Sequence, residues 1–302
     1  METIFDFATF DNFSKVAQKL RREFEDKYLD VRSTRLDRFQ WDPFSIPDQY
    51  QFLRTPAQSF FSTKDFESFA EKLVIFGREN FACENISTPW LSLYREGDFQ
   101  GMHADLPHGP FAFVFSLSPS GEVFSGGETL LLKSKVLSYW AQNHRGANFE
   151  QGEVFERISP KFNRLTIFDP RIPHGVSPVS RAQTPLEGRL VIHGWFVNPG
   201  PQIEGTVSSK SAQKFLDVFV GEFLESTSPL LHNFQGTLII EIRNTFEKLS
   251  AQLKLSTLRN PIGEGIHKKL VNARIAQIIR QPKIASILKS SCKLLLPISF
   301  EV

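Results

Sequence analysis

The chain has 302 residues and is nearly neutral, with 35 Lys and Arg residues against 33 Asp and Glu and a formal net charge of +2. This balance excludes a protein whose overall charge alone would bind nucleic acid or acidic surfaces. The hydrophobic fraction of 41% is typical of a globular protein, and no apolar run approaches the roughly 20 residues that span a bilayer. The first residues, METIFDFATFDNFSK, lack the basic flank and long apolar stretch of a secretory signal, so we expect none. Cys83 and Cys292 lie far apart and outside any CxxC pair, so we expect a cytoplasmic protein without disulfides, in which nitrogen and oxygen atoms hold any metal.

The first 83 residues predict two supporting helices. Residues 11–28 show apolar side chains at intervals of three and four, with Asp11 placed to cap the start. Residues 62–80 show a similar pattern, with Ser62 or Thr63 at the cap position.

Residues 84–200 have a sequence pattern that is typical of strands and turns. Short apolar runs are separated by Gly, Pro, Ser and Asn; they are WLSLY, FAFVFSL, ETLLL, RLTIF and RLVIHGWF. This pattern predicts a β-sandwich or an open barrel.

The end of the chain predicts helices again, over residues 209–225, 234–254 and 264–290. Between Arg243 and Lys293 there are 11 basic residues against two acidic ones, a net charge of 11 − 2 = +9. Such a segment can bind nucleic acid or anionic lipid. We favour the alternative that its apolar side chains pack on the barrel while its lysines face water.

A possible metal site lies in the stretch YREGDFQGMHADLPHGP, residues 94–110. Side chains two residues apart in a strand point the same way, so His103 and Asp105 are expected to converge. His174 follows the strand at 163–168, just past a loop with two prolines. Two histidines and one carboxylate, with open positions opposite, suit non-haem iron(II) and oxygen chemistry.

A basic side chain is expected beside this site. In the strand RLVIHGWF, alternation places Arg189, Val191, His193 and Trp195 on one face. The planar guanidinium of an arginine can donate hydrogen bonds to both oxygens of a carboxylate, which favours Arg189 as the residue that binds an anion. An ion pair between Arg189 and a buried acid is the alternative. For His193 a pocket-lining or hydrogen-bonded role is favoured over a fourth ligand.

Several motifs occur in order between about residues 85 and 200: LSLYREGDFQGMHAD, FVFSLSP, FSGGETLLL, RLTIFDPRIPHGV and GRLVIHGWF. Together they resemble the iron(II)- and 2-oxoglutarate-dependent oxygenases, in the branch similar to prolyl 4-hydroxylases. The resemblance implies that His103, Asp105 and His174 are the catalytic iron ligands. It further implies that Arg189 and Tyr94 bind the cosubstrate 2-oxoglutarate.

The resemblance also implies a fold. We expect an α+β protein with a double-stranded β-helix (jelly-roll) core. The catalytic domain is expected at 1–205, with supporting helices in 1–83 and the core at 84–200, followed by a C-terminal helical extension at 206–302.

The implied activity is hydroxylation of an unactivated C–H bond in a small molecule, an amino acid or a peptide. Fe(II) would serve as the metal cofactor, and 2-oxoglutarate and O2 would be consumed with release of succinate and CO2. Ascorbate is a candidate activator. One alternative is a protein hydroxylase of the prolyl type. Another is a non-catalytic β-scaffold that binds anionic lipid or nucleic acid through its basic C-terminal helices; nucleic acid is the less favoured partner. The apolar tail helices are compatible with a homodimer.

Overall fold

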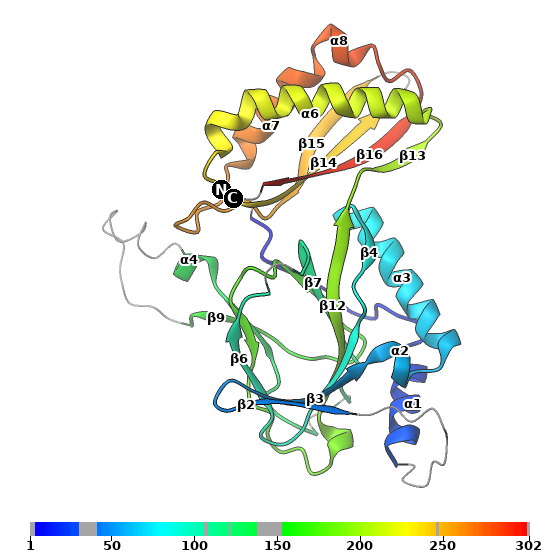
Figure 1. The fold of residues 1–302 in the computed structure, drawn as a ribbon, viewed down its shortest axis with the longest axis vertical. Coiled ribbons are helices and arrows are strands. Elements are labelled where there is room, and N and C mark those ends of the chain that lie inside the picture. The colour runs from blue at the N-terminus through cyan, green and yellow to red at the C-terminus, as the bar shows by residue number, and fades with distance from the viewer. Residues whose placement is uncertain are drawn as a thin grey trace.

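The computed structural model describes residues 4–29, 41–105, 108–119, 121, 123–137, 153–245 and 248–300. Its elements form two units that lie one above the other along the long axis of the molecule (Figure 1). We call residues 4–199 the barrel unit and residues 202–300 the C-terminal unit. No helix among the described residues is long and apolar enough to cross a membrane.

The barrel unit contains one antiparallel sheet of 12 strands with helices packed on one side. Its strands are β1 (Phe7–Phe10), β2 (Asp42–Ile46), β3 (Tyr50–Pro56), β4 (Cys83–Ile86), β5 (Trp90–Tyr94), β6 (Phe99–His103), β7 (Phe111–Ser116), β8 (Thr129–Leu132), β9 (Phe155–Ile158), β10 (Leu165–Phe168), β11 (His174–Val176) and β12 (Arg189–Pro199). Its helices are α1 (Ala17–Leu29), α2 (Ala57–Phe60), α3 (Thr63–Phe81), α4 (Ser134–Leu137) and the short 3-10 helix η1 (Pro185–Glu187).

The sheet curls into two layers. Its strand order is β1-β10-β7-β12-β5-β3-β6-β11-β8-β9, with β2 paired to β3 and β4 paired to β12. The first layer, which carries the helices, consists of β1, β10, β7, β12, β5 and β3. The strands β6, β11, β8 and β9 fold back over it (Figure 1). This arrangement is the predicted double-stranded β-helix, and all five apolar runs identified in residues 84–200 lie in its strands.

Phenylalanine side chains fill the core between the first layer and the helices α1 and α3. Phe69, Phe115 and Phe196 are fully buried in this cluster, and the rings of Phe69 and Phe115 lie 4.6 Å apart between centroids. Alternation along the strands therefore leaves the opposite face of the same layer free to line a cavity.

The two predicted N-terminal helices are present, with one change. The helix α3 begins after Ser62 as expected. The helix α1 begins only at Ala17, and Asp11 does not cap it. Instead, the Asp11 carboxylate pairs with Arg164, because β1 precedes the helix and places this turn beside β10.

The C-terminal unit is not the helical extension that we predicted. It is an antiparallel sheet of four strands with three helices on one face (Figure 1). Its elements are β13 (Gln202–Gly205), α6 (Ser209–Leu231), β14 (Gly236–Asn244), β15 (Leu249–Ser256), α7 (Lys268–Ile279), α8 (Pro282–Ala285) and β16 (Cys292–Phe300). The helix predicted at 209–225 is confirmed, and the one at 264–290 is confined to α7 and α8. The division of the chain at residue 205 stays a prediction, and β13 pairs with β16 of the second sheet.

The predicted helix at 234–254 is wrong, because this segment forms the hairpin β14–β15. Leu238, Ile240 and Ile242 pack under the helices, whereas Ile239 packs toward the barrel unit. Because apolar residues lie on both faces of β14, their spacing in the sequence resembles that of a helix. The run of β-branched residues was the signal for a strand.

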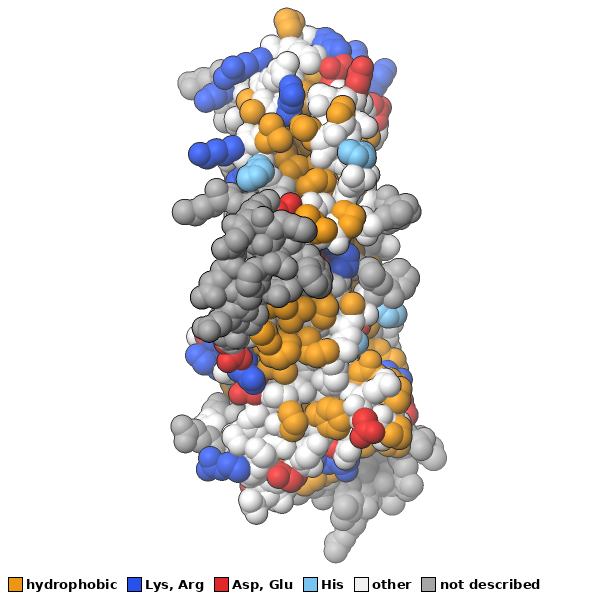
Figure 2. Space-filling view, turned by 90° about the vertical axis from the view of Figure 1, so that its left-hand side faces the viewer, with side chains coloured by type: hydrophobic (Ala, Val, Ile, Leu, Met, Phe, Trp, Pro, Cys, Tyr) orange, Lys and Arg blue, Asp and Glu red, His pale blue; other side chains and the backbone are white. Residues whose placement is uncertain are grey.

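The basic residues of the C-terminal unit are dispersed. On the face in Figure 2, Lys and Arg side chains lie among apolar and acidic ones over the upper unit. Three cations of this unit form ion pairs with acids of the same unit: Arg243 with Glu241, Lys283 with Glu222, and Lys293 with Glu204. This arrangement agrees with the interpretation that the lysines face water.

Candidate active site

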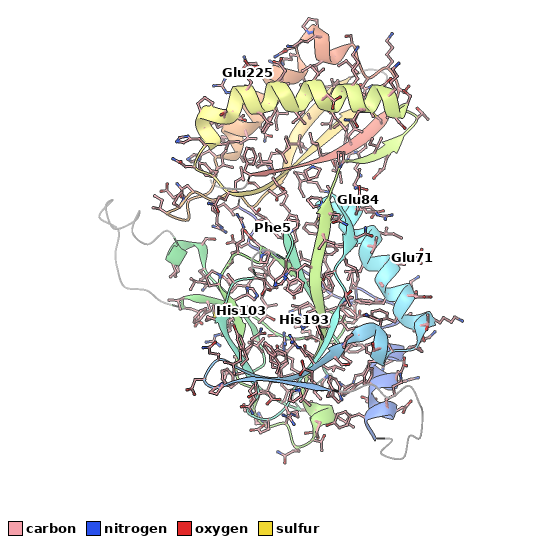
Figure 3. The ribbon with its side chains drawn as sticks, in the orientation of Figure 1. Phe5, Glu71, Glu84, His103, His193 and Glu225 are labelled. Carbon is pink, nitrogen blue, oxygen red and sulfur yellow. The ribbon has the colours of Figure 1, made fainter. Side chains whose placement is uncertain are left out.

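A cavity of about 340 Å³ lies between the two layers of the barrel unit. Its floor is formed by residues of β3, β5, β7, β10 and β12, and its other wall by residues of β6, β8 and β11, with Phe44 of β2 beside them. Figure 3 shows His103 and His193 on strands of these two different walls. The strand periodicity used to interpret the sequence therefore places both the histidines and Arg189 around one space.

The three predicted metal ligands meet at one point of this cavity. One ligand atom from each of His103, Asp105 and His174 lies within 4.8 Å of the others. The Nε2 atom of His103 is 3.4 Å from one oxygen of Asp105, and the Nε2 atom of His174 is 3.2 Å from the other oxygen. His103 and His174 are direct partners in the pairing of β6 with β11, which explains why residues 71 positions apart in sequence (174 − 103) converge.

Backbone hydrogen bonds fix both imidazole rings. The Nδ1 atom of His103 lies 2.9 Å from the carbonyl of Gly101, and the Nδ1 atom of His174 lies 2.8 Å from the carbonyl of Ile172. A carbonyl only accepts, so each Nδ1 carries a proton and each Nε2 faces Asp105 and the cavity. Once it gives up its own proton, each Nε2 presents a lone pair to a metal ion. Metal-binding histidines are oriented in the same way.

Asp105 is ionised in this setting. Burial opposes its charge, but hydrogen bonds with His103 and His174 outweigh burial and lower the pKa of the carboxyl well below its usual range. For His103 burial lowers the pKa, but Asp105 and the Gly101 carbonyl outweigh burial, so the pKa is raised above the usual value. A charged carboxylate next to two lone pairs is a complete set of protein ligands for a divalent ion.

Arg189 is buried in the same cavity with only 2% of its surface exposed. Its Nη2 atom donates to Thr129 Oγ1 at 3.1 Å, while Nε and Nη1 have no hydrogen-bond partner. The predicted alternative, an ion pair with a buried acid, is absent among the described residues, since no carboxylate lies within reach of this guanidinium. Two unpaired donors on a buried cation are suited to bind the carboxylate of an anionic ligand.

Tyr94 lies beside Arg189 at the closed end of the cavity. The guanidinium carbon is 4.7 Å from the centre of the tyrosine ring, and the hydroxyl donates to Gln100 Oε1 at 3.0 Å. Burial raises the pKa of Tyr94 to about 12, with Arg189 opposing this shift, so the ring is neutral. The face of the ring thus helps to hold the guanidinium in place.

His193 is not a metal ligand. Its Nε2 atom lies 2.8 Å from Ser92 Oγ, and it is absent from the group of side chains that can share one ion. Burial, then the nearby Arg189, lower its pKa to about 4, so it is a neutral, hydrogen-bonded residue of the cavity wall, as predicted.

Sequence reasoning missed several residues of the cavity. Thr129 and Gln100 hold Arg189 and Tyr94, and the β2–β3 hairpin contributes Arg54 and Phe52. Alternation of Tyr50, Phe52 and Arg54 was the only sequence signal for β3. The indole nitrogen of Trp195 is also buried in the cavity wall without a partner.

These observations test whether iron(II) and 2-oxoglutarate suit the site. Two imidazole nitrogens and one carboxylate leave open positions on a metal, as non-haem iron(II) oxygenases require. The unpaired nitrogens of Arg189, buried in the same cavity, match the second carboxylate of a dicarboxylic acid. The fold and the site together define a non-haem iron oxygenase built on a double-stranded β-helix.

Comparison with known proteins agrees with this class. Residues 89–197 match the model of a family described as the 2OG-Fe(II) oxygenase superfamily. The matched segment contains an intact His-Asp-His iron-binding triad. The match and the triad together imply Fe(II) as the metal and 2-oxoglutarate as the cosubstrate. A search of curated proteins finds no match.

Prolyl hydroxylases are among the solved structures similar to this chain. A Pseudomonas putida prolyl-4-hydroxylase shares 16% identity with a TM-score of 0.45, covering 64% of this chain and 93% of the other. A Trichoplax adhaerens prolyl hydroxylase, in complex with a peptide fragment of the hypoxia inducible factor oxygen degradation domain, shares 16% with a TM-score of 0.44, covering 64% and 83%. A viral collagen prolyl hydroxylase from Paramecium Bursaria Chlorella virus-1 shares 14% with a TM-score of 0.37, covering 63% and 94%.

Proposed function

We propose that this protein hydroxylates an unactivated C–H bond of a small molecule, an amino acid or a peptide. The observation that carries the proposal is the buried guanidinium of Arg189, which faces the cavity of the triad with two unpaired nitrogens. When bound, iron(II) and 2-oxoglutarate supply the oxidant from O2, with succinate and CO2 as coproducts.

Each side chain has one task in this proposal. His103, Asp105 and His174 hold the ion, and their second hydrogen bonds keep the ligand atoms directed at it. Arg189 holds the far carboxylate of the cosubstrate, in a site where burial strengthens the interaction. Tyr94 and Thr129 keep the guanidinium in place from two sides.

The opposite end of the cavity is proposed to bind the substrate. Trp195 offers an unpaired indole N–H there, and the ring of His108 stacks on it at 4.4 Å. Arg54 lies against the rings of Phe44 and Trp90, at 4.0 and 4.6 Å. Aromatic walls, one donor and one cation favour a substrate that carries a hydrogen-bond acceptor and an anionic group.

An anaerobic titration with iron(II) and 2-oxoglutarate tests the cosubstrate site, followed by the weak visible charge-transfer band of the chelate. The wild-type protein is expected to show the band and His174→Ala to lose it. Arg189→Ala is expected to need at least tenfold more 2-oxoglutarate. The exposed Arg157→Ala on β9 is the control. A band of equal strength in all variants contradicts the assignment.

Substrate oxidation needs a separate measurement. Succinate is measured with amino acids, short peptides and matched amides, each against the uncoupled background without substrate. We expect carboxylate-bearing compounds to raise succinate above this background and their amides to do so less. Prolyl-type hydroxylation of a protein is supported if only proline-containing peptides respond.

A scaffold that binds anionic lipid or nucleic acid remains the alternative from another class of protein. The intact triad and the dispersed cations of the C-terminal unit both favour the enzyme. Binding to anionic vesicles or RNA over a salt series tests it, because phosphate contacts weaken steeply with salt. A cytoplasmic location and a homodimer through the C-terminal helices are also proposals, tested by fractionation and by light scattering.

A further inference from the structure

The loop between β10 and β11, residues 169–173, supports two of the three metal ligands through its backbone. The carbonyl of Pro170 accepts a hydrogen bond from the backbone N–H of Asp105 at 2.9 Å. The carbonyl of Ile172 accepts from Nδ1 of His174 at 2.8 Å. The position of this loop, which we call the ligand loop, therefore sets the position of Asp105 and His174.

The ligand loop is held by Arg171. Its Nε and Nη2 atoms donate to the two carboxylate oxygens of Asp169 at 2.9 and 2.6 Å, and Asp169 is fully buried. Nη2 also donates to the backbone carbonyl of Thr257, which belongs to the C-terminal unit. One guanidinium thus joins the ligand loop to the second sheet. These partners, Asp169 and the Thr257 carbonyl, occupy the Nε and Nη2 atoms of Arg171.

The C-terminal unit provides a fitted place for this guanidinium. A Cβ atom on Gly236, at the start of β14, would lie 2.7 Å from Nη2 of Arg171 and 2.7 Å from the Thr257 carbonyl. Thr257 is fixed in turn by Thr237, through hydrogen bonds of 2.9 Å between Thr257 N and Thr237 O and between Thr237 N and Thr257 Oγ1. Arg171 therefore contacts a hydrogen-bonded part of the C-terminal unit. Gly236 leaves room for the guanidinium and also has a φ of +127°, so an alanine there strains the backbone as well as crowding Arg171.

A second connection runs in parallel through the N-terminal segment. The backbone N–H of Asp169 donates to the carbonyl of Asp6 at 3.1 Å, and the carboxylate of Asp6 pairs with Arg259 of the C-terminal unit. Phe5, labelled near the junction of the two units in Figure 3, donates its N–H to the carbonyl of Ser256 at 2.8 Å. Residues 256–259 are thus connected to the ligand loop in two ways, through Arg171 and through the N-terminal segment.

We propose that Arg171 is a positioning residue through which the C-terminal unit fixes the geometry of the iron site. The C-terminal unit is then part of the metal-binding machinery, although none of its residues lines the cavity. The inference concerns metal affinity and is independent of the substrate proposed above. A guanidinium keeps its charge at all ordinary pH values, so the connection persists whenever the protein is folded.

Anaerobic titration with Co(II), followed by its visible absorption, measures metal affinity without turnover. Arg171→Ala is expected to raise the Kd for Co(II) about tenfold, the lower end of the effect of outer-sphere partners. Gly236→Ala is expected to weaken Co(II) binding too, because the added methyl displaces the guanidinium. The double variant is expected to be no worse than Arg171→Ala alone, since both changes break one connection. The affinity of the metal-loaded protein for 2-oxoglutarate is expected to stay within twofold.

The matched control is Arg164→Ala. It removes an arginine of the barrel unit that likewise donates to both carboxylate oxygens of an aspartate, Asp11, but lies away from the ligand loop. It is expected to bind Co(II) like the wild type. The proposal is overturned if Arg171→Ala and Gly236→Ala bind Co(II) normally, or if Arg164→Ala weakens binding equally. Should Arg171→Ala fail to fold, Gly236→Ala alone decides, with circular dichroism as the check on its fold.

Discussion

Arg189 and Tyr94 are direct partners in the pairing of β12 with β5, and the guanidinium lies 4.7 Å from the centre of the tyrosine ring. The ring and Thr129 hold the cation, yet two of its nitrogens stay unpaired. Burial lowers the pKa of Arg189, against the opposing effect of Tyr94. The buried charge of Arg189 is thus costly in the protein alone, and under the proposed function the cosubstrate compensates it.

This cost predicts the behaviour of Arg189→Met. Without 2-oxoglutarate the variant is expected to be as stable as the wild type or up to about 3 kcal/mol more stable, because an uncompensated buried charge is replaced by an apolar side chain. Thermal unfolding is measured with Mn(II), with and without 2-oxoglutarate. The cosubstrate should raise the Tm of the wild type only. A variant clearly less stable without cosubstrate would contradict this account.

Tyr94→Phe removes the hydroxyl that donates to Gln100. The resemblance implies that this hydroxyl donates to 2-oxoglutarate when the cosubstrate is bound. We therefore expect the KM for 2-oxoglutarate to rise about fivefold with kcat little changed, which corresponds to about 1 kcal/mol for one hydrogen bond. Tyr28→Phe serves as the control, because Tyr28 packs on Phe24 away from the cavity. Steady-state succinate assays decide, and an unchanged KM would limit Tyr94 to a packing role.

His193 makes stability depend on pH. Its pKa is lowered to about 4 in the folded protein, against an ordinary value near 6.5. Between these values the unfolded chain binds more protons, so the free energy of unfolding falls as pH drops from about 6.5 to 4. The loss is at most about 3 kcal/mol.

His193→Gln should reduce this slope, whereas the exposed His232→Gln, at the end of α6, should leave it unchanged. Urea unfolding at several pH values measures the effect. Equal slopes in the wild type and His193→Gln would show that other groups cause the pH dependence.

Gly77→Ala tests the packing of α3 on the barrel. The added Cβ would lie 2.5 Å from Cδ1 of Phe196, which is fully buried. We expect a loss of about 1–3 kcal/mol in the free energy of unfolding, as overpacked cores show. Gly221→Ala in α6 is the matched control, because open space surrounds that position, and it should gain about 0.5–1 kcal/mol. Denaturant unfolding of both variants would reveal any reversal of this order.

The triad and Arg189 could be predicted from the sequence because local geometry controls them. Alternation within β12 places Arg189 and His193 on one face. Asp105 follows His103 by two residues, just past the end of β6, so the short spacing keeps the two side chains close. The same reasoning failed at residues 234–254, where Ile239 faces the barrel unit and Ile240 faces the helices. A strand buried on both faces loses the alternation that identifies it.

The sequence by itself therefore determined the chemistry of the site: which atoms can bind a metal and which cation can bind a dicarboxylic acid. Only the tertiary structure decided how that site is supported. Arg171 meets Thr257 across 86 positions of sequence (257 − 171), beside a glycine that belongs to a third segment. Such contacts depend on how two sheets pack against each other, and no short-range periodicity records that relation.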